Sequence, residues 1–177
     1  GAPVVAAPSS ESPMRILVNF DNGPQEPGWI AVNDGVMGGQ SRGMPRVENG
    51  ELVFCGELSL ANSGGFASVR SVGRDFDLSD ASVVVLRVRG DGRSYQLRLA
   101  TDTRYRGVSI SYGAEFQTTA GEWTESRLPL ASLTPTVRGA HLRGPPLDSS
   151  NVREIGLLIA DKREGAFALK VDWIAVE

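Results

Sequence analysis

Short runs of alternating apolar and polar residues, separated by Gly- and Pro-rich stretches, follow one another along most of the chain. The first run, residues 15–20, places Ile16, Val18 and Phe20 on one face. Runs of this kind recur at intervals of roughly a dozen residues, which is typical of a β-sandwich. Residues 1–13 lack the pattern, so we expect a disordered arm or linker there and a single all-β sandwich domain over residues 14–177.

The most regular local pattern is a pair of alternating runs, 83–89 and 94–100, on either side of Gly90-Asp91-Gly92-Arg93. Asp-Gly is favoured in the two-residue turns of β-hairpins, because both turn positions need positive φ. We therefore predict a hairpin with Asp91-Gly92 at its tip and its apolar residues facing the core. The opposed core pairs in this register are Val88 with Tyr95, Leu86 with Leu97, and Val84 with Leu99.

The other face of this predicted hairpin is polar. It carries Arg87, Arg89, Gln96 and Arg98, and the next strand, 106–112, adds Ser109 and Ser111 if it joins the same sheet. Arg side chains without interleaved acids form a candidate binding surface. The alternative is the ordinary solvated face of a sandwich.

Three further patterns make specific predictions. Residues 153–160 are almost continuously apolar, which favours a strand in the middle of a sheet. In the last strand Phe167, Leu169, Val171 and Trp173 alternate with polar or small residues and are expected in the core. Short helical turns are expected near 130–133 and 149–152.

Charge and composition narrow the function classes. Of the 177 residues, 41% are hydrophobic, and the net charge is −3. No apolar run approaches the ~18 residues of a membrane span, and nucleic-acid-binding domains are usually strongly basic. We therefore expect no membrane span and no nucleic-acid partner. Lys162 and Lys170 are the only lysines among 18 basic residues; this Arg bias fits either a GC-rich genome or recognition of carboxylates and other anions by guanidinium groups.

No enzyme site is predicted. His141 and Cys55 are the only residues of their types, too few for a zinc cluster, and no Gly-x-Ser-x-Gly motif accompanies the histidine. We predict no catalytic residue and no cofactor. Calcium needs only oxygen ligands, so Asp21, Asn22 and Asp172 are weak calcium candidates if the first and last strands pair; ordinary exposed acids are the alternative.

Two Gly-rich stretches hold the remaining candidates. Asn33 and Asp34 precede the first, residues 35–41, and Asn62 and Arg70 bound the second. The first lacks the Gly-Lys-Ser/Thr ending of a phosphate loop. Glycine indicates positive φ or close backbone approach, so the two stretches are either tight crossings packed together or a ligand site.

Several of these segments together resemble the complex I intermediate-associated family, in the family's order from about Phe20 to Val176. The most specific is Val32-Asn33-Asp34-Gly35-Val36-Met37-Gly38-Gly39. The other segments that carry the resemblance are Trp29, Ser41, Gly43, 54–60, Asn62, 64–70, 89–95, Trp123, 128–130, 155–157 and 165–171.

The resemblance implies a galactose-binding-like jelly-roll β-sandwich. It also implies a non-catalytic, chaperone-like relation to assembly factors for respiratory NADH:ubiquinone oxidoreductase, whose subunits would be the protein partner. It supplies no catalytic residue, so motif and chemistry together leave Asn33, Asp34, Asn62 and Arg70 as binding candidates beside the polar face. The chain shows no Arg-rich, amphipathic presequence, which favours a bacterial member, cytoplasmic or periplasmic, over a mitochondrial one.

Two rival functions stay open at this point. A carbohydrate or small-ligand module on the same fold predicts an aromatic platform on a concave sheet face, for which Trp29, Trp123 and Tyr112 are the available residues. Alternation places Tyr95, Tyr112 and Trp173 in the core, which counts against that platform. Carboxylate-based glycoside chemistry is the least favoured alternative.

Overall fold

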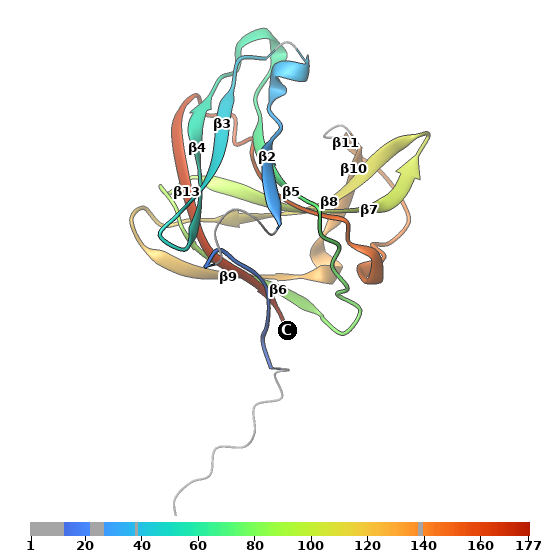
Figure 1. Cartoon of the computed structure of the whole chain (residues 1–177). Coiled ribbons are helices and arrows are strands. Elements are labelled where there is room, and N and C mark those ends of the chain that lie inside the picture. The colour runs from blue at the N-terminus through green and yellow to red at the C-terminus, as the bar shows by residue number, and fades with distance from the viewer. Residues whose placement is uncertain (1–12, 22–26, 38, 138–139) are drawn as a thin grey trace, which may run out of the picture.

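The computed structural model describes residues 13–21, 27–37, 39–137 and 140–177, and these form two antiparallel sheets that face each other (Figure 1). The predicted N-terminal arm, apart from Pro13, lies outside the described residues. Among the described residues, no helix is both long and apolar enough to cross a membrane.

The first sheet has six strands, in the order β3-β4-β13-β6-β9, with β1 also paired to β13. Its strands are β1 (Arg15–Asn19), β3 (Arg42–Glu48), β4 (Glu51–Leu58), β6 (Val83–Arg89), β9 (Trp123–Pro129) and β13 (Gly165–Val176).

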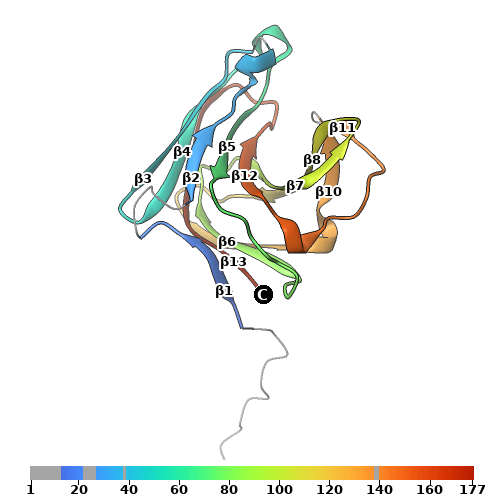
Figure 2. The ribbon, with the colours of Figure 1, turned by 45° about the vertical axis from the view of Figure 1, so that its right-hand side comes forward.

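The second sheet has seven strands, in the order β11-β10-β8-β7-β12-β5-β2. Its strands are β2 (Gly28–Ala31), β5 (Ala67–Val72), β7 (Ser94–Tyr105), β8 (Val108–Gln117), β10 (Thr134–Val137), β11 (Ala140–His141) and β12 (Glu154–Ile159). This sheet curves, with β2 and β5 on one side of β7 and β10 and β11 on the other, and its outward face lies inside the curve (Figure 2).

The core lies between the sheets and is rich in aromatic side chains. Phe54 and Phe167 meet edge to face with ring centroids 4.9 Å apart, and Tyr95 of the opposite sheet approaches both at 6.4 Å. Edge contacts of this kind add to the hydrophobic gain of burial. The architecture is the predicted galactose-binding-like jelly-roll sandwich.

The predicted hairpin is wrong, although its core residues are correct. β6 pairs with β13 and β9, whereas β7 pairs with β8 and β12 in the other sheet. Val88 therefore lies beside Val171, and Tyr95 lies beside Phe116. The Gly90–Arg93 segment crosses from one sheet to the other, so the two apolar faces meet across the core instead of lying side by side in one sheet.

Polar interactions of Asp91 and Arg93 explain why the crossover is not a hairpin turn. The Asp91 carboxylate accepts hydrogen bonds from the Arg93 amide (3.0 Å), the Tyr95 hydroxyl (3.0 Å) and the Ala168 amide (2.9 Å). Arg93 in turn forms a two-pronged pair with Asp161, at 2.8 and 2.6 Å. These long-range contacts outweigh the local preference of Asp-Gly for a hairpin, and no periodicity signals them.

The crossover also divides the predicted polar face. Arg87 and Arg89 point outward from the six-stranded sheet, whereas Gln96 and Arg98 point outward from the seven-stranded sheet. Because β8 pairs with β7, Ser111 shares the face of Gln96 and Arg98, as expected. The candidate surface is therefore two surfaces on opposite sides of the sandwich.

Two β-bulges account for the other errors. One register shift, between Ile16 and Val18, buries Leu17 with Val18 and leaves Ile16 45% exposed. The other, between Val171 and Trp173, buries Ile174 and leaves Trp173 half-buried instead of in the core. An extra residue in a strand reverses the facing of all residues beyond it.

Other sequence predictions are confirmed. β12 lies between β5 and β7 inside its sheet, as predicted. The pairing of β1 with β13 meets the condition stated for the calcium candidates. Short 3-10 turns occur at Leu130–Ser132 and Ser149–Asn151. Cys55 is half-buried.

Replacing Arg93 by Ala should destabilise the fold strongly. The side chains of Arg93 and Asp161 are only 8% and 11% exposed, and removing one partner of a buried pair typically costs about 3–5 kcal/mol. Urea denaturation of Arg93→Ala measures the loss of unfolding free energy. Arg89→Ala, at an exposed position of the neighbouring strand, is the control and should stay within about 0.5 kcal/mol of wild type. A loss below about 1 kcal/mol for Arg93→Ala would contradict the role assigned to the crossover.

Candidate functional site

The Asp34 carboxylate joins the two Gly-rich stretches. Asp34 is fully buried. Its carboxylate accepts hydrogen bonds from the Ser41 hydroxyl (2.6 Å), the Ser41 amide (2.9 Å), the Gly65 amide (2.7 Å) and the Phe66 amide (3.2 Å). Both loops therefore close on one buried negative charge, with its lone pairs satisfied from within the fold.

Gly39 and Gly64 pack so closely against Asp34 that no side chain fits at either position. A Cβ atom at Gly39 would lie 2.3 Å from Cγ of Asp34, and one at Gly64 would lie 2.6 Å from Oδ2 of Asp34. Side chains at these positions would displace the carboxylate. This geometry favours the interpretation of two crossings packed together.

Asn33 has a similar fastening role. Its side-chain amide donates to the Gly43 carbonyl at 3.1 Å and accepts from the Ser68 amide at 3.3 Å. Asn62 is exposed and has φ of 55°, a left-handed conformation that Asn tolerates well. The structure thus places Asn33 and Asp34 in the scaffold and leaves Asn62 at the surface of a loop.

The hydrogen bonds also set the ionisation of Asp34. Burial by itself raises the pKa of Asp34, but the bonds from Ser41, Gly65 and Phe66 outweigh it and hold the pKa below its ordinary value. The carboxylate therefore stays charged at neutral pH.

The outward face of the seven-stranded sheet brings together three of the other candidates, Arg70, Gln96 and Arg98. Arg70, Gly156, Arg98, Gly113 and Thr134 occupy one row across β5, β12, β7, β8 and β10. We call this row and its neighbours on the same side the curved face. It combines two predicted residues from distant segments, Arg70 and Arg98, which sequence reasoning did not place side by side.

Arg98 lies across the middle of the curved face. It donates to the Gln96 side-chain carbonyl at 3.1 and 2.8 Å and to the Thr136 hydroxyl at 3.1 Å. The Thr136 hydroxyl in turn donates a hydrogen bond to the Ser111 carbonyl at 3.1 Å. Burial lowers the pKa of Arg98, and the nearby positive charge of Arg70 lowers it further.

Glu154 is the acidic neighbour of this row. Its carboxylate lies 3.7 Å from Nε of Arg70. Burial raises the pKa of Glu154, while Arg70 acts in the opposite direction. Sequence reasoning missed Glu154 because its strand looks uniformly apolar.

Among the described residues, the curved face has no aromatic platform of the kind that a sugar module would use. The outward strand positions of β2, β5, β12, β7, β8 and β10 carry no Trp, Tyr or Phe among the described residues. Tyr95 and Tyr112 are buried in the core, as predicted. Trp29 packs against the core, and Trp123 belongs to the other sheet.

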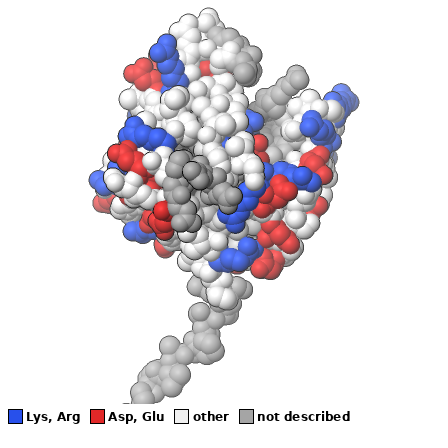
Figure 3. All heavy atoms as spheres, in the orientation of Figure 1, with Lys and Arg blue, Asp and Glu red and all other residues white. Residues whose placement is uncertain are grey.

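The opposite face has a different character. The Arg87 guanidinium lies 5.4 Å from the ring centre of Trp123 and 3.4 Å from the Asp172 carboxylate. Arg89 is exposed next to this cluster. Over the side of the molecule seen in Figure 3, positive and negative side chains are interspersed.

The weak calcium hypothesis gains no support. Asp172 pairs with Arg87, and a Cβ at Gly50 would lie 3.0 Å from Oδ1 of Asp21. Asn22 lies outside the described residues. Within the described part of the chain, no group of three or more acidic, His or Cys side chains is arranged to hold a metal ion. His141 is exposed on β11.

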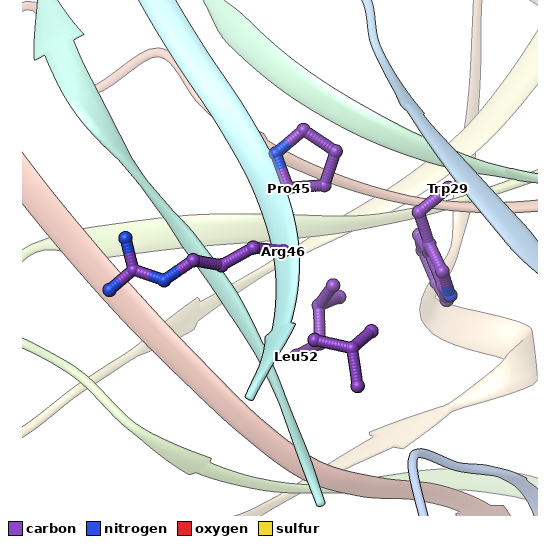
Figure 4. A pocket seen from close by; sticks show the side chains of 5 residues that line it. Trp29, Pro45, Arg46 and Leu52 are labelled. Carbon is purple, nitrogen blue, oxygen red and sulfur yellow. The ribbon is translucent and has the colours of Figure 1, made fainter. Parts of the chain in front are cut away.

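A small pocket opens between β2 and β3. It has a volume of about 80 Å³, well below the roughly 300–1,000 Å³ of typical small-molecule sites. Trp29, Pro45 and Leu52 line it, while the Arg46 guanidinium points away from Trp29 (Figure 4). The buried Nε1 of Trp29 has no hydrogen-bond partner among the described residues.

Comparison with solved structures defines the class of fold. The family 11 carbohydrate-binding module of a Clostridium thermocellum cellulosomal cellulase superposes with a TM-score of 0.66 and 13% identity, covering 94% of this chain and 96% of the module. A structure of the family 11 module in complex with a mixed-linked tetrasaccharide has the same TM-score. The agarase AgWH50C superposes with a TM-score of 0.62 and 12% identity over 24% of its chain. The fold is thus the β-sandwich of carbohydrate-binding modules.

Sequence comparison identifies the family within this class. The complex I intermediate-associated protein 30 family matches residues 18–171, and the chain belongs to it. The mouse mitochondrial complex I intermediate-associated protein 30 is 26% identical over 183 residues, and a probable Caenorhabditis elegans counterpart is 30% identical over 150 residues. These matches cover 92% and 73% of this chain but only 56% and 43% of the relatives, so the chain spans about half their length.

The Asp34 interactions predict a pH-dependent loss of stability. A depressed folded pKa stabilises the fold above the unfolded Asp pKa, about 3.9, and this contribution disappears as the pH falls through the folded value. Asp34→Asn should lower the unfolding free energy by roughly 2–3 kcal/mol at pH 7, with a gap to wild type that narrows below about pH 4. Denaturation at several pH values measures the gap. A gap independent of pH would contradict the assignment.

The close packing of the loops predicts contrasting effects of Ala at three glycines. Gly39→Ala and Gly64→Ala should each cost about 1–3 kcal/mol of unfolding free energy, the usual penalty for overpacking. Gly35→Ala is the matched control, because a Cβ atom at Gly35 would meet nothing within 4 Å beyond its chain neighbours. Thermal denaturation of the three variants measures the effects. Equal stability for all three would show that the loops do not pack as described.

Proposed function

We propose that this chain is a non-catalytic binding domain that acts as a chaperone-like assembly factor related to those for respiratory NADH:ubiquinone oxidoreductase, and that its curved face binds the protein partner. The observation that carries the proposal is the family match over residues 18–171. The relatives are named as complex I intermediate-associated proteins. A protein partner, with respiratory-complex subunits as the first candidates, follows from that relation.

The geometry supports the curved face as the binding surface. The Asp34 and Asp91 carboxylates, which lie in segments that carry the family resemblance, are occupied by hydrogen bonds within the fold. Polar side chains on the curved face instead lie at a surface of mixed polar and apolar groups. A partly charged, partly apolar surface is typical of transient protein interfaces.

Carbohydrate binding is the second candidate. It is favoured by the fold shared with a family 11 carbohydrate-binding module, which has been solved with a mixed-linked tetrasaccharide. The missing aromatic platform on the curved face counts against it. A glycan array probed with the domain distinguishes the two candidates, because only a sugar module should retain oligosaccharides.

Affinity capture from the native host tests the proposal directly. Tagged wild-type protein should enrich respiratory-complex subunits, and Arg98→Glu should reduce this enrichment at least about tenfold, because it places a negative charge at the centre of the interface. Arg89→Glu makes the same charge reversal on the other sheet and should capture as wild type does. The circular dichroism spectra of both variants check that they are folded. Undiminished capture by Arg98→Glu would remove the curved face from the proposal, and no enriched subunits would remove the assembly role.

A further inference from the structure

Arg98 is a half-buried cation whose hydrogen bonds go to neutral atoms. A guanidinium carries five N–H donors, and the bonds to Gln96 and Thr136 use three of them. No carboxylate of the described residues forms an ion pair with Arg98 within 4.0 Å, whereas Arg93 and Arg87 each face an Asp. Arg98 therefore has donors and positive charge to offer a ligand.

Arg70 supplies a second positive charge beside it. The two residues flank Gly156, where a Cβ atom would lie 3.7 Å from Cγ of Arg70 and 3.7 Å from Cβ of Arg98. Among the residues that the structure describes, Glu154 is the only acid paired with Arg70 or Arg98, and it lies 3.7 Å from Nε of Arg70. Two cations thus border a strand position that has no side chain.

We propose that Arg98 and Arg70 bind a carboxylate of an acidic segment in the partner protein, held over Gly156 on the curved face. Guanidinium groups bind carboxylates in a two-pronged geometry that lysine does not reproduce. Burial, and then the positive charge of Arg70, lowers the pKa of Arg98, and no carboxylate of the described residues pairs with Arg98 to offset this. This inference deepens the proposed function and rests on it.

The surroundings favour a protein segment over an acidic sugar. Ile30 lies beside Arg70 in the sheet, and Val72 follows on the same strand; these apolar side chains are 47% and 40% exposed. Apolar side chains next to a charged pair suit the alternating acidic and apolar residues of a polypeptide. A sugar acid would use a ring-stacking platform, and the described strand positions of this face carry none.

A bead-displayed library of random octapeptides tests the inference with the folded chain as it is. Peptides retained by wild-type protein should be enriched in Asp and Glu at least about threefold over the unselected library. Arg98→Gln should abolish this enrichment and weaken binding of a selected acidic peptide at least about tenfold. Gly156→Val should act in the same way, because its side chain fills the space between the two arginines.

The controls separate the site from the fold. Arg89→Gln removes a cation from the opposite sheet and should keep the acidic enrichment. A Cβ atom at position 156 has room, since its nearest neighbour would be the Val69 carbonyl at 3.4 Å, and the melting temperature of Gly156→Val checks that the variant is folded. A selected peptide with Asp and Glu replaced by Asn and Gln should lose its binding.

Three results would overturn the inference: no acidic enrichment with wild type, acidic enrichment that persists in Arg98→Gln, or binding of oligogalacturonate without any acidic peptide. These results are distinct from failure of the proposed function. If respiratory-complex subunits are still captured while the library shows no acidic preference, the assembly role stands and the carboxylate site falls.

Discussion

The arrangement of this protein depends on the polar contacts that carry the chain from one sheet to the other between β6 and β7. Half-buried Asp91 accepts hydrogen bonds from the Tyr95 hydroxyl and the Ala168 amide, and Arg93 forms a largely buried ion pair with Asp161. A buried charge is costly unless it is paired and hydrogen-bonded. The Arg93–Asp161 pair therefore favours this path of the chain from β6 to β7. That route decides which side chains share a surface: it separates Arg87 from Arg98 and places Arg98 in one row with Arg70.

The buried carboxylate of Asp34 holds the two Gly-rich loops together. Its four hydrogen bonds and the glycines packed on it explain the most specific part of the family resemblance without any ligand. A motif rich in Asn, Asp and Gly resembles a binding loop, yet here it builds the scaffold. We therefore expect the partner to bind the curved face, where Arg70 and Arg98 are half-buried and partly accessible.

The sequence predicts strands and their facing better than it predicts their pairing. Alternation correctly buries Tyr95, Leu97 and Leu99, because burial depends on local periodicity. The partner of each strand depends on contacts distant in sequence, such as Arg93 with Asp161, and a bulge such as that before Trp173 leaves no periodic signal. Of the candidate site, Gln96 and Arg98 are predicted on one polar face and Arg70 is predicted separately. That Arg70 shares this face, with Glu154 beside it, emerges only from the register of β5, β12 and β7.

The curved face, and not the outer face of the six-stranded sheet, is the surface that we expect to meet the protein partner. Site-specific photo-crosslinking in the native host tests this most directly, with a photoreactive amino acid at Ala100 on β7 or at Ala168 on β13. These alanines are matched in size and point outward from opposite sheets. We predict a crosslinked partner from position 100 and none from position 168. Crosslinking from position 168 alone would contradict the assignment of the partner to the curved face.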